Sequence, residues 1–484
     1  MKRSVTETKN DELTFRFSSP ENRSIFGNIG HDQMACLVIS LCISLLSIFI
    51  IRGPVGILFG FTIVLVGIVC AFVRVNSYTP CFLLFSYLEF KFSQFNSRQI
   101  QHLRPLCGHL QNGDLNSADA RNSLFQVSLN RSENNAGYIV DFKEKTVSIA
   151  ILLCGNGLGL NTLLERNLAV MNWAEFLSSL AQRSNKLHRI QLLKSTFVDD
   201  FADLEQPYYR DENSTEIASK IASNSYNSLV DSFKTKLPVY ETLLVLSRSS
   251  LLNIETISEE VKSLLSEVEI VSQSARRLGI ETKGILSDTG LTKHITRSFV
   301  QDPCTNTSWP NNKSYPWPLS TSESWEYFKT DANFHASFWI SEWPRNDVGA
   351  DFLAPVILTS SIRLTFSVVF EAIESTKALR EVERHRTETY ANKLIRKNAG
   401  FLETAKRQLH SAGIDQREAE LSLGHSAYRF SGYLRITAAT IEDLERCQAE
   451  LETTASRSHL EIRRLYGNQK HIFSYGLPIA RGLK

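Results

Sequence analysis

The sequence lacks the motifs of several common enzyme classes. It contains no G-x-x-x-x-G-K-[ST] string, which nucleotide hydrolases use to hold phosphates, and neither H-E-x-x-H for zinc nor G-x-S-x-G for a catalytic serine. The glycine cluster at residues 155–159 (GNGLG) lacks the lysine and the glycine spacing of a phosphate-binding loop, so a permissive turn is favoured there. We therefore predict no catalytic residues and no cofactor.

Signals for metal and nucleic-acid binding are also missing. The eight cysteines form no Cys-x-x-Cys pair and the eleven histidines are scattered, so we predict no metal ligands and no disulfide framework. The 53 Lys and Arg residues nearly balance the 51 Asp and Glu residues, which leaves a net charge of +2. A nucleic-acid-binding surface needs concentrated positive charge, so we expect no direct nucleic-acid binding.

Two long uncharged runs follow a polar N-terminal segment, residues 1–33. Residues 34–51 and 55–73 contain no charged side chain, and helices of these lengths span about 27–29 Å at about 1.5 Å per residue, close to the thickness of membrane hydrocarbon. Arg52-Gly53-Pro54 between them favours a turn. We predict a transmembrane hairpin over residues 34–73; two buried helices of a soluble bundle are the alternative, disfavoured because both faces are apolar.

Two crossings would place both termini in one compartment. The positive residues near the hairpin are Arg16 and Arg23 before it, Arg74 and Lys91 after it, and Arg52 at its tip. The positive-inside rule then favours a multi-pass protein of the plasma (inner) membrane with a cytoplasmic soluble region. Within the juxtamembrane segment, residues 74–119, an aromatic-rich stretch at residues 81–92 either lies at the headgroup boundary or packs on the soluble region.

From about residue 120 the period of the apolar residues alternates between two and 3.6, which predicts alternating strands and helices. The predicted strands are 138–142, 146–153, 187–193, 239–246, 362–370, 428–437 and 460–466. The predicted helices are 163–180, one within 206–236, 257–278 capped by Gly279, a long charged helix from Glu371 to Leu423, and 441–455. This order predicts an α+β fold built from open, ferredoxin-like strand and helix units, each covered on one face by helices.

A proline-rich segment divides this soluble region. Residues 302–318 hold four prolines among Asn and Ser residues, a composition typical of a linker or an ordered loop. We predict a first α+β domain at residues 120–301 and a second, which contains the long charged helix, at residues 319–484.

Aromatic residues are concentrated at the start of the second domain. Five of the six tryptophans lie between residues 309 and 343, and Trp and Arg dominate the hot spots of protein interfaces. The candidate partner-docking residues are Trp339, Glu342, Trp343, Arg345 and Asp351. A core position is favoured over docking for Trp339, whereas both interpretations stay open for Trp343 and Arg345.

Several segments resemble a known family. They are EWPRNDVGADFLAP at 342–355, LREVERHRT at 379–387, YRFSGY at 428–433 and RRLYGNQ at 463–469, followed by Leu477-Pro478 and Arg481-Gly482-Leu483. These segments and the N-terminal hairpin resemble actinobacterial integral membrane proteins encoded with conjugation-type secretion ATPases. In that family the hairpin is similar to the two-helix membrane subunit of type IV secretion systems, and the soluble part to the non-motor N-terminal region of the secretion ATPase.

The resemblance implies a non-catalytic membrane scaffold. Its expected partners are the lipid bilayer, a separate motor ATPase and channel subunits, and a homo-oligomer is compatible with this role. Two alternatives stay open: a membrane-anchored enzyme with an unrecognised site, and a general membrane-anchored interaction module. Co-purification of a partner ATPase without nucleotide turnover by the chain itself would favour the scaffold.

Overall fold

A computed structural model of the chain describes residues 13–15, 17, 31–51, 53–73, 80–95, 100–102, 124–133, 135–155, 161–183, 186–198, 238–250, 254–300, 317–318, 320–331, 333–398 and 405–483. The helix predicted within 206–236, almost all of the proline-rich segment 302–318 and most of the glycine cluster 155–159 lie outside the described residues. The described part is a mixed α+β structure, as predicted, and its strands form one large antiparallel sheet.

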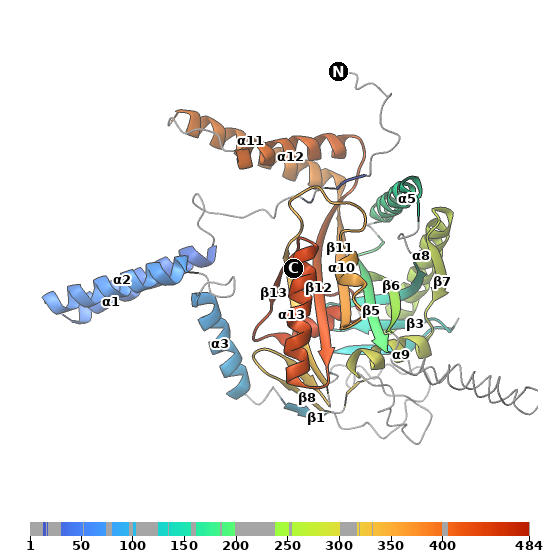
Figure 1. Cartoon of the computed structure of the whole chain (residues 1–484), viewed down its shortest axis with the longest axis horizontal. Helices are drawn as coiled ribbons and strands as arrows, with labels where there is room; N and C mark the ends of the chain where they lie inside the picture. Colours follow the sequence, from blue (N-terminus) through green and yellow to red (C-terminus); the bar gives the residue numbers. More distant parts are fainter. Residues whose placement is uncertain are drawn as a thin grey trace, which may run out of the picture.

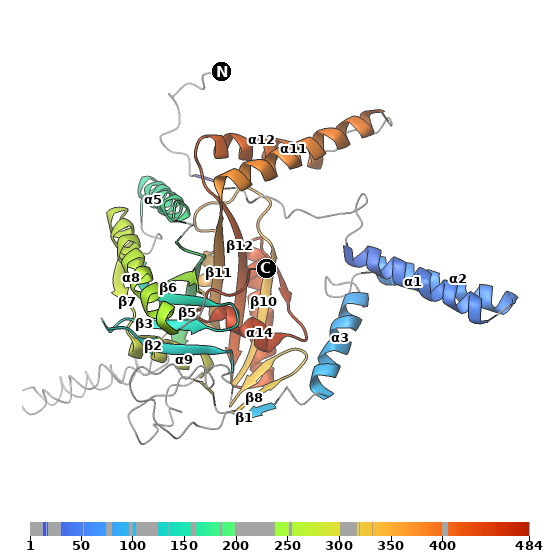
Figure 2. The same ribbon diagram turned by 180° about the vertical axis from the view of Figure 1, so that it is seen from behind.

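The N-terminal apolar runs form a helical hairpin. Helices α1 (His31–Ile50) and α2 (Pro54–Phe72) are joined at Gly53, whose φ of 122° is accessible to glycine, and Pro54 occupies the first turn of α2. The Ser44 hydroxyl donates to the Gly60 carbonyl at 2.9 Å, and Gly67 lies so close to Ser40 that a side chain there would clash. The hairpin projects away from the sheet in both views (Figures 1 and 2).

Helix length and composition identify fewer membrane spans than the sequence predicted. Among the described residues, Pro54–Phe72 is the helix that is long and apolar enough to cross a bilayer, while Cys36–Ile50 is a shorter apolar stretch. After the hairpin, helix α3 (Pro80–Phe95) packs on the sheet region, since Tyr87 and Phe90 contact the Trp325 ring edge-on at 5.5 and 5.6 Å.

The described strands form one antiparallel sheet. In spatial order they are β1 (Ile100–His102), β8 (Ser320–Glu323), β9 (Phe328–Thr330), β10 (Asn333–Glu342), β12 (Ala427–Ala438), β11 (Arg363–Ile373), β5 (Arg189–Val198), β6 (Pro238–Ser249), β4 (Thr146–Cys154), β3 (Gly137–Asp141) and β2 (Val127–Arg131). Off this path, β13 (Glu461–Arg464) pairs with β10 and β7 (Glu281–Ile285) pairs with β4.

Two units with the same connectivity make up most of this sheet. The first unit is β4, α5 (Leu163–Ala181), β5, β6, α8 (Ile254–Arg277) and β7; the second unit is β10, α10 (Ala354–Ile357), β11, β12, α13 (Ile441–Arg457) and β13. If the four strands of a unit are numbered along the chain, their order across the sheet is fourth, first, third, second in both units. Strands β5 and β11 pair from Ser195–Thr365 to Ile190–Phe370, so the regions predicted as separate domains share one sheet.

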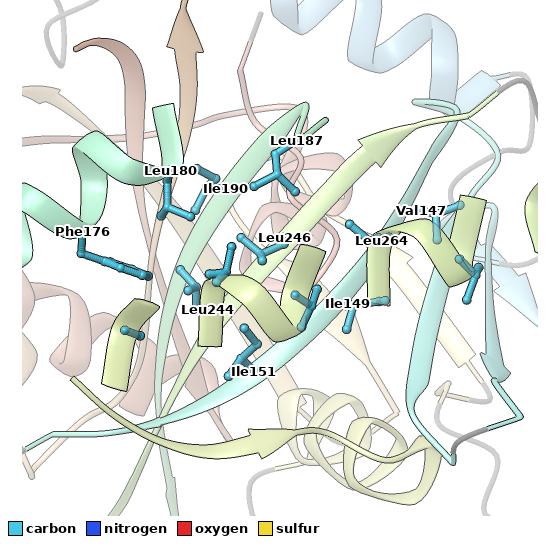
Figure 3. Packing of buried hydrophobic residues seen from close by; sticks show 14 of the residues in the cluster. Val147, Ile149, Ile151, Phe176, Leu180, Leu187, Ile190, Leu244, Leu246 and Leu264 are labelled. Carbon is cyan, nitrogen blue, oxygen red and sulfur yellow. The ribbon is translucent and has the colours of Figure 1, made fainter. Parts of the chain in front are cut away.

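The sheet is covered on both faces, whereas the sequence predicted helices on one face. On the first face, Leu264 of α8 and Phe176 of α5 pack on Ile149 and Leu244 of the first unit (Figure 3), and α13 covers the second unit in the same way. On the other face lie α9 (Asp288–Phe299), α14 (Gln469–Phe473), the 3-10 turn Ser474–Gly476 and the C-terminal tail. The second cover was missed because α14 and the 3-10 turn have only five and three residues, and because the four-residue repeat of Leu291, Ile295 and Phe299 in α9 was overlooked.

The charged stretch is two helices and not one. Residues Glu371 to Ile373 still belong to β11, and α11 (Ser375–Asn398) and α12 (Ala405–Ser422) lie side by side as a projecting pair (Figure 1). Arg386 donates to the Glu418 carboxylate at 2.6 and 2.8 Å across the pair. A folded-back pair lets the charged faces neutralise each other, which the sequence period alone does not reveal.

Candidate docking site

Trp343 leaves the sheet at an irregularity in strand β10. The register between β10 and β13 shifts between Ile340 and Glu342, and such a bulge changes the direction of the side chains that follow. A Cβ on Gly432 of β12 would lie 2.8 Å from the Trp343 ring, so only glycine lets the indole lie this close to the strand. Trp343 is therefore half-buried against the second unit.

An aromatic cluster surrounds Trp343. We define it as Phe17, Trp343, Phe352 and Phe430. The Phe17 ring stacks on Trp343 with centroids 5.2 Å apart and lies 5.4 Å from Phe352, while Phe430 meets Trp343 edge-on at 5.3 Å. These separations are typical of favourable aromatic pairs, each contributing about 0.5–1.5 kcal/mol beyond its buried area. Three distant parts of the chain thus meet at one point.

The N-terminal flank of the hairpin reaches this cluster as an extended segment. Phe15 N–H donates to the Val348 carbonyl at 2.9 Å, and Val348 N–H donates to the Phe15 carbonyl at 3.0 Å, which forms an antiparallel bridge. Leu13 N–H donates to Asn167 Oδ1 of α5 at 3.1 Å. We call residues 13–17, of which 13–15 and 17 are described, the clasp segment, because it connects the region before α1 to the body of the protein.

The structure separates Trp339 from the other predicted docking residues. Its side chain alternates with Phe338 and Ile340, which belong to the core beneath α13, so Trp339 faces the opposite side of the sheet. Its indole N–H donates to the Ser431 hydroxyl at 3.1 Å. Trp339 is half-buried on β10 and does not join the aromatic cluster.

The remaining three predicted residues lie at the edge of the cluster. Arg345 forms an ion pair with Glu342, and this hydrogen bond and attraction raise the pKa of Arg345 above its usual value. Asp351 is exposed and, together with Asp347, lines a surface hollow of about 530 Å³ beside Val348. Arg457 lines the same hollow, so side chains of both charge signs face it.

Sequence reasoning missed the residues that complete the site. Phe17 and Phe15 lie in the segment described above as polar, and Phe430 was noted in a predicted strand and in the YRFSGY motif without being assigned to the site. The available signal was the alternation of Leu13, Phe15 and Phe17 within a polar segment, a pattern typical of an extended strand. That alternation does not indicate which surface the strand contacts.

The chemistry of the site is that of binding an extended chain. It offers aromatic rings and a backbone N–H and C=O pair at Val348. Within the described ranges, no three His, Cys, Asp or Glu side chains are grouped so that they could hold a metal ion. Comparison with protein-family models finds no match, and no curated protein sequence matches the chain.

Proposed function

We propose that the chain is a non-catalytic, membrane-anchored scaffold of a type IV secretion-like machine, which docks a partner motor ATPase at the membrane. The single observation that carries the anchoring is the contact between the clasp segment and the body. The clasp segment precedes the hairpin, and Val348 follows it. The contact therefore requires both flanks of the hairpin to share one side of any membrane.

This requirement favours two crossings over one. A single crossing by α2 would put residues 13–17 and the body in different compartments, where Phe15 and Val348 could not pair. Zero crossings would leave large apolar side chains in water, because Phe49, Ile50, Leu58 and Phe61 are each more than two thirds exposed. Two helices packed through Ser and Gly contacts, with apolar side chains outside, have the arrangement of a membrane hairpin.

Helix α3 supports a body held close to the bilayer. Its inner face contacts Trp325, whereas its outer face carries Leu84, Phe85, Leu88 and Phe92, all exposed. A helix with one apolar face free and next to a hairpin is suited to lie in the headgroup region. Both interpretations of residues 81–92 then apply, one to each face of α3.

The docking role rests on the position of the most distinctive segment of the resemblance. Residues 342–355 supply Trp343, Val348 and Phe352 to the candidate docking site. A surface with aromatic rings and an exposed arginine, in a region that resembles secretion proteins, fits a protein-docking role. The geometry supports the binding of a protein segment at this site.

The anchoring is tested by fractionation and protease protection. We expect the full chain to stay with membranes after carbonate washing, and an N-terminal epitope tag and the body to be cleaved from the same side of sealed vesicles. Full chain in the aqueous supernatant, or a tag protected while the body is cleaved, would refute the two-span anchor.

The scaffold role is tested by capture from detergent-solubilised membranes. We expect a motor ATPase to co-purify with the wild-type chain, and the purified chain itself to turn over no nucleotide. Turnover by the chain without any captured ATPase would favour the membrane-anchored enzyme instead.

A further inference from the structure

The clasp segment occupies a site that the body builds without it. Trp343 packs on Phe430 and on the core of the second unit, and Val348 lies on the loop that connects β10 to α10. These contacts lie entirely among residues after the hairpin. Removing residues 13–17 would therefore uncover the ring of Trp343 and the backbone of Val348 without removing their supports.

The clasp segment itself is attached at few points. Among its described residues, the backbone bonds are the pair with Val348 and one to Asn167, and the ring contact is that of Phe17. Leu13 and Phe15 stay 38% and 37% exposed. The attachment that the described residues of the clasp make, one stacked ring and three hydrogen bonds, is small compared with a domain core, so it can open while the body stays folded.

The mode of attachment indicates what else the site would accept. Backbone pairing at Val348 is independent of side-chain identity, while alternate side chains of an extended segment fall on the same side. Leu13, Phe15 and Phe17 therefore define a pattern of three apolar residues at alternate positions. Any accessible strand with that pattern competes for the same contacts.

We propose that the candidate docking site is a strand-docking site, which receives an extended segment of the partner protein with apolar side chains at three alternate positions. The clasp segment is the resting occupant, and the partner's segment displaces it. This inference rests on the proposed docking function and specifies its recognition mode. Because a segment in the same chain competes at an effective concentration of about millimolar, the clasp restricts the site to partners that are presented locally or bind tightly.

The test measures binding of a fluorescent peptide with the sequence of residues 11–19 to the full chain in detergent. The opened variant carries Phe15→Pro and Phe17→Ala, which remove one backbone donor and the ring that stacks on Trp343. We expect the opened variant to bind the peptide at least tenfold more tightly than the wild type. Adding Phe430→Ala, a change on the exposed side of the cluster, should abolish this gain.

Two controls make the result specific. Thr14→Pro places proline next to the bridge but leaves both hydrogen bonds of Phe15 available, so this variant should bind the peptide as weakly as the wild type. A peptide with Ser at positions 15 and 17 should bind no variant. Equal peptide binding by wild-type and opened chains, or binding that survives Phe430→Ala, would overturn the proposal.

The experiment also separates this inference from the proposed function. Peptide binding in detergent needs neither membrane insertion nor a motor ATPase, so failed fractionation with normal peptide binding would refute the anchor alone. Failure of peptide binding with normal capture of the ATPase would refute strand docking alone. If opened chains dimerise through the clasp segments of added wild-type chains, the site accepts a second copy of this chain. The proposal of a separate partner protein is then wrong.

Discussion

The two units of the sheet are alike in their frameworks and differ in one crossover. Helix α8 buries Leu264, Val271 and Ala275 against the first unit, and α13 buries Leu444, Leu451 and Ala455 against the second unit at the same spacings of seven and four. Both helices cover the same face of the sheet. One packing solution is therefore used twice.

The likeness extends to the ends of these helices. Ile280 N–H donates to the Ala275 carbonyl at 2.9 Å, and Leu460 N–H donates to the Ala455 carbonyl at 2.9 Å. Each turn contains one residue with positive φ, Gly279 at 74° and His459 at 54°. The same C-terminal capping geometry thus forms with glycine in one unit and histidine in the other.

The units differ in the first crossover, which is the connection between the first and second strands of each unit. In the first unit it is the 19-residue helix α5, begun by a capping box between Thr162 and Glu165. In the second unit it is a loop with the four-residue helix α10, and this loop carries Trp343 and Val348. The comparison teaches that the repeated parts hold the sheet, while the crossover that departs from the repeat supplies the candidate docking site.

The largest expected effect comes from cutting the link between the C-terminal tail and the first half of the sheet. Arg481 donates to both oxygens of Asp141 at 2.6 and 2.7 Å, and both side chains are at most 2% exposed. Arg481→Met leaves a buried carboxylate unpaired, so we expect the free energy of unfolding to fall by about 3–5 kcal/mol in denaturant titrations. The exposed Arg457→Met should change it by less than about 0.5 kcal/mol; equal effects of the two changes would contradict this role.

The next effect tests whether the two frameworks are equivalent. Leu264→Ala and Leu444→Ala each remove a buried side chain at matched positions of α8 and α13. We expect each change to lower the free energy of unfolding by about 2–5 kcal/mol, with values within about 1 kcal/mol of each other. A large loss for one and none for the other would show that the two units do not share a packing solution.

His335 should make the second unit sensitive to acid, in addition to the contribution of His188 in the first unit, whose pKa burial also lowers. His335 is fully buried between the hydroxyls of Thr330 and Thr437, and burial, with Arg435 and Arg363 nearby, holds the pKa of His335 well below its usual value. In the folded protein His335 therefore stays neutral at pH values at which the same side chain takes up a proton in the unfolded chain. We expect the free energy of unfolding to fall as the pH drops below about 6.5, by up to about 1.4 kcal/mol per pH unit.

The matched variant for this pH effect is His335→Gln. Its stability should depend less on pH in this range, although its stability at neutral pH is lower because the two hydroxyl contacts are altered. An unchanged pH slope in His335→Gln would assign the acid sensitivity to another group.

The smallest effect distinguishes the two helix ends. At Gly279 a Cβ would meet no atom closer than 4.0 Å, so Gly279→Ala costs only the strain of positive φ, about 1 kcal/mol. His459→Gly relieves the same strain and should raise the free energy of unfolding by less than about 1 kcal/mol, since glycine also gains freedom in the unfolded chain. Changes of the same sign at both positions would contradict the shared capping geometry.

Local patterns were enough to predict much of the framework. The apolar period of residues 257–278 and the glycine that follows gave α8 and its left-handed end at Gly279. The alternation of apolar and polar residues predicted β4 and β11 almost to their ends. In contrast, β7 and α9 were missed. Strand β7 has only five residues, which give a weak periodic signal, whereas α9 does carry a helical repeat of Leu291, Ile295 and Phe299 that was overlooked.

The candidate site could be predicted only in part. The tryptophan-rich stretch marked Trp343 as unusual, but Trp339, which shares that composition, faces the other side of the sheet and bonds Ser431. Phe17 escaped notice because its neighbours in sequence are polar. A side chain's function here depends on which strand or loop faces it, and composition carries no such information.

The sequence by itself determined the long periodic elements such as α8 and β11, and which stretches are apolar enough to need lipid or a core. Tertiary structure alone decided that β5 pairs with β11 and that Phe15 pairs with Val348. The physical reason is that backbone N–H and C=O groups at a strand edge are the same for every residue except proline, so edges pair according to the folded geometry around them.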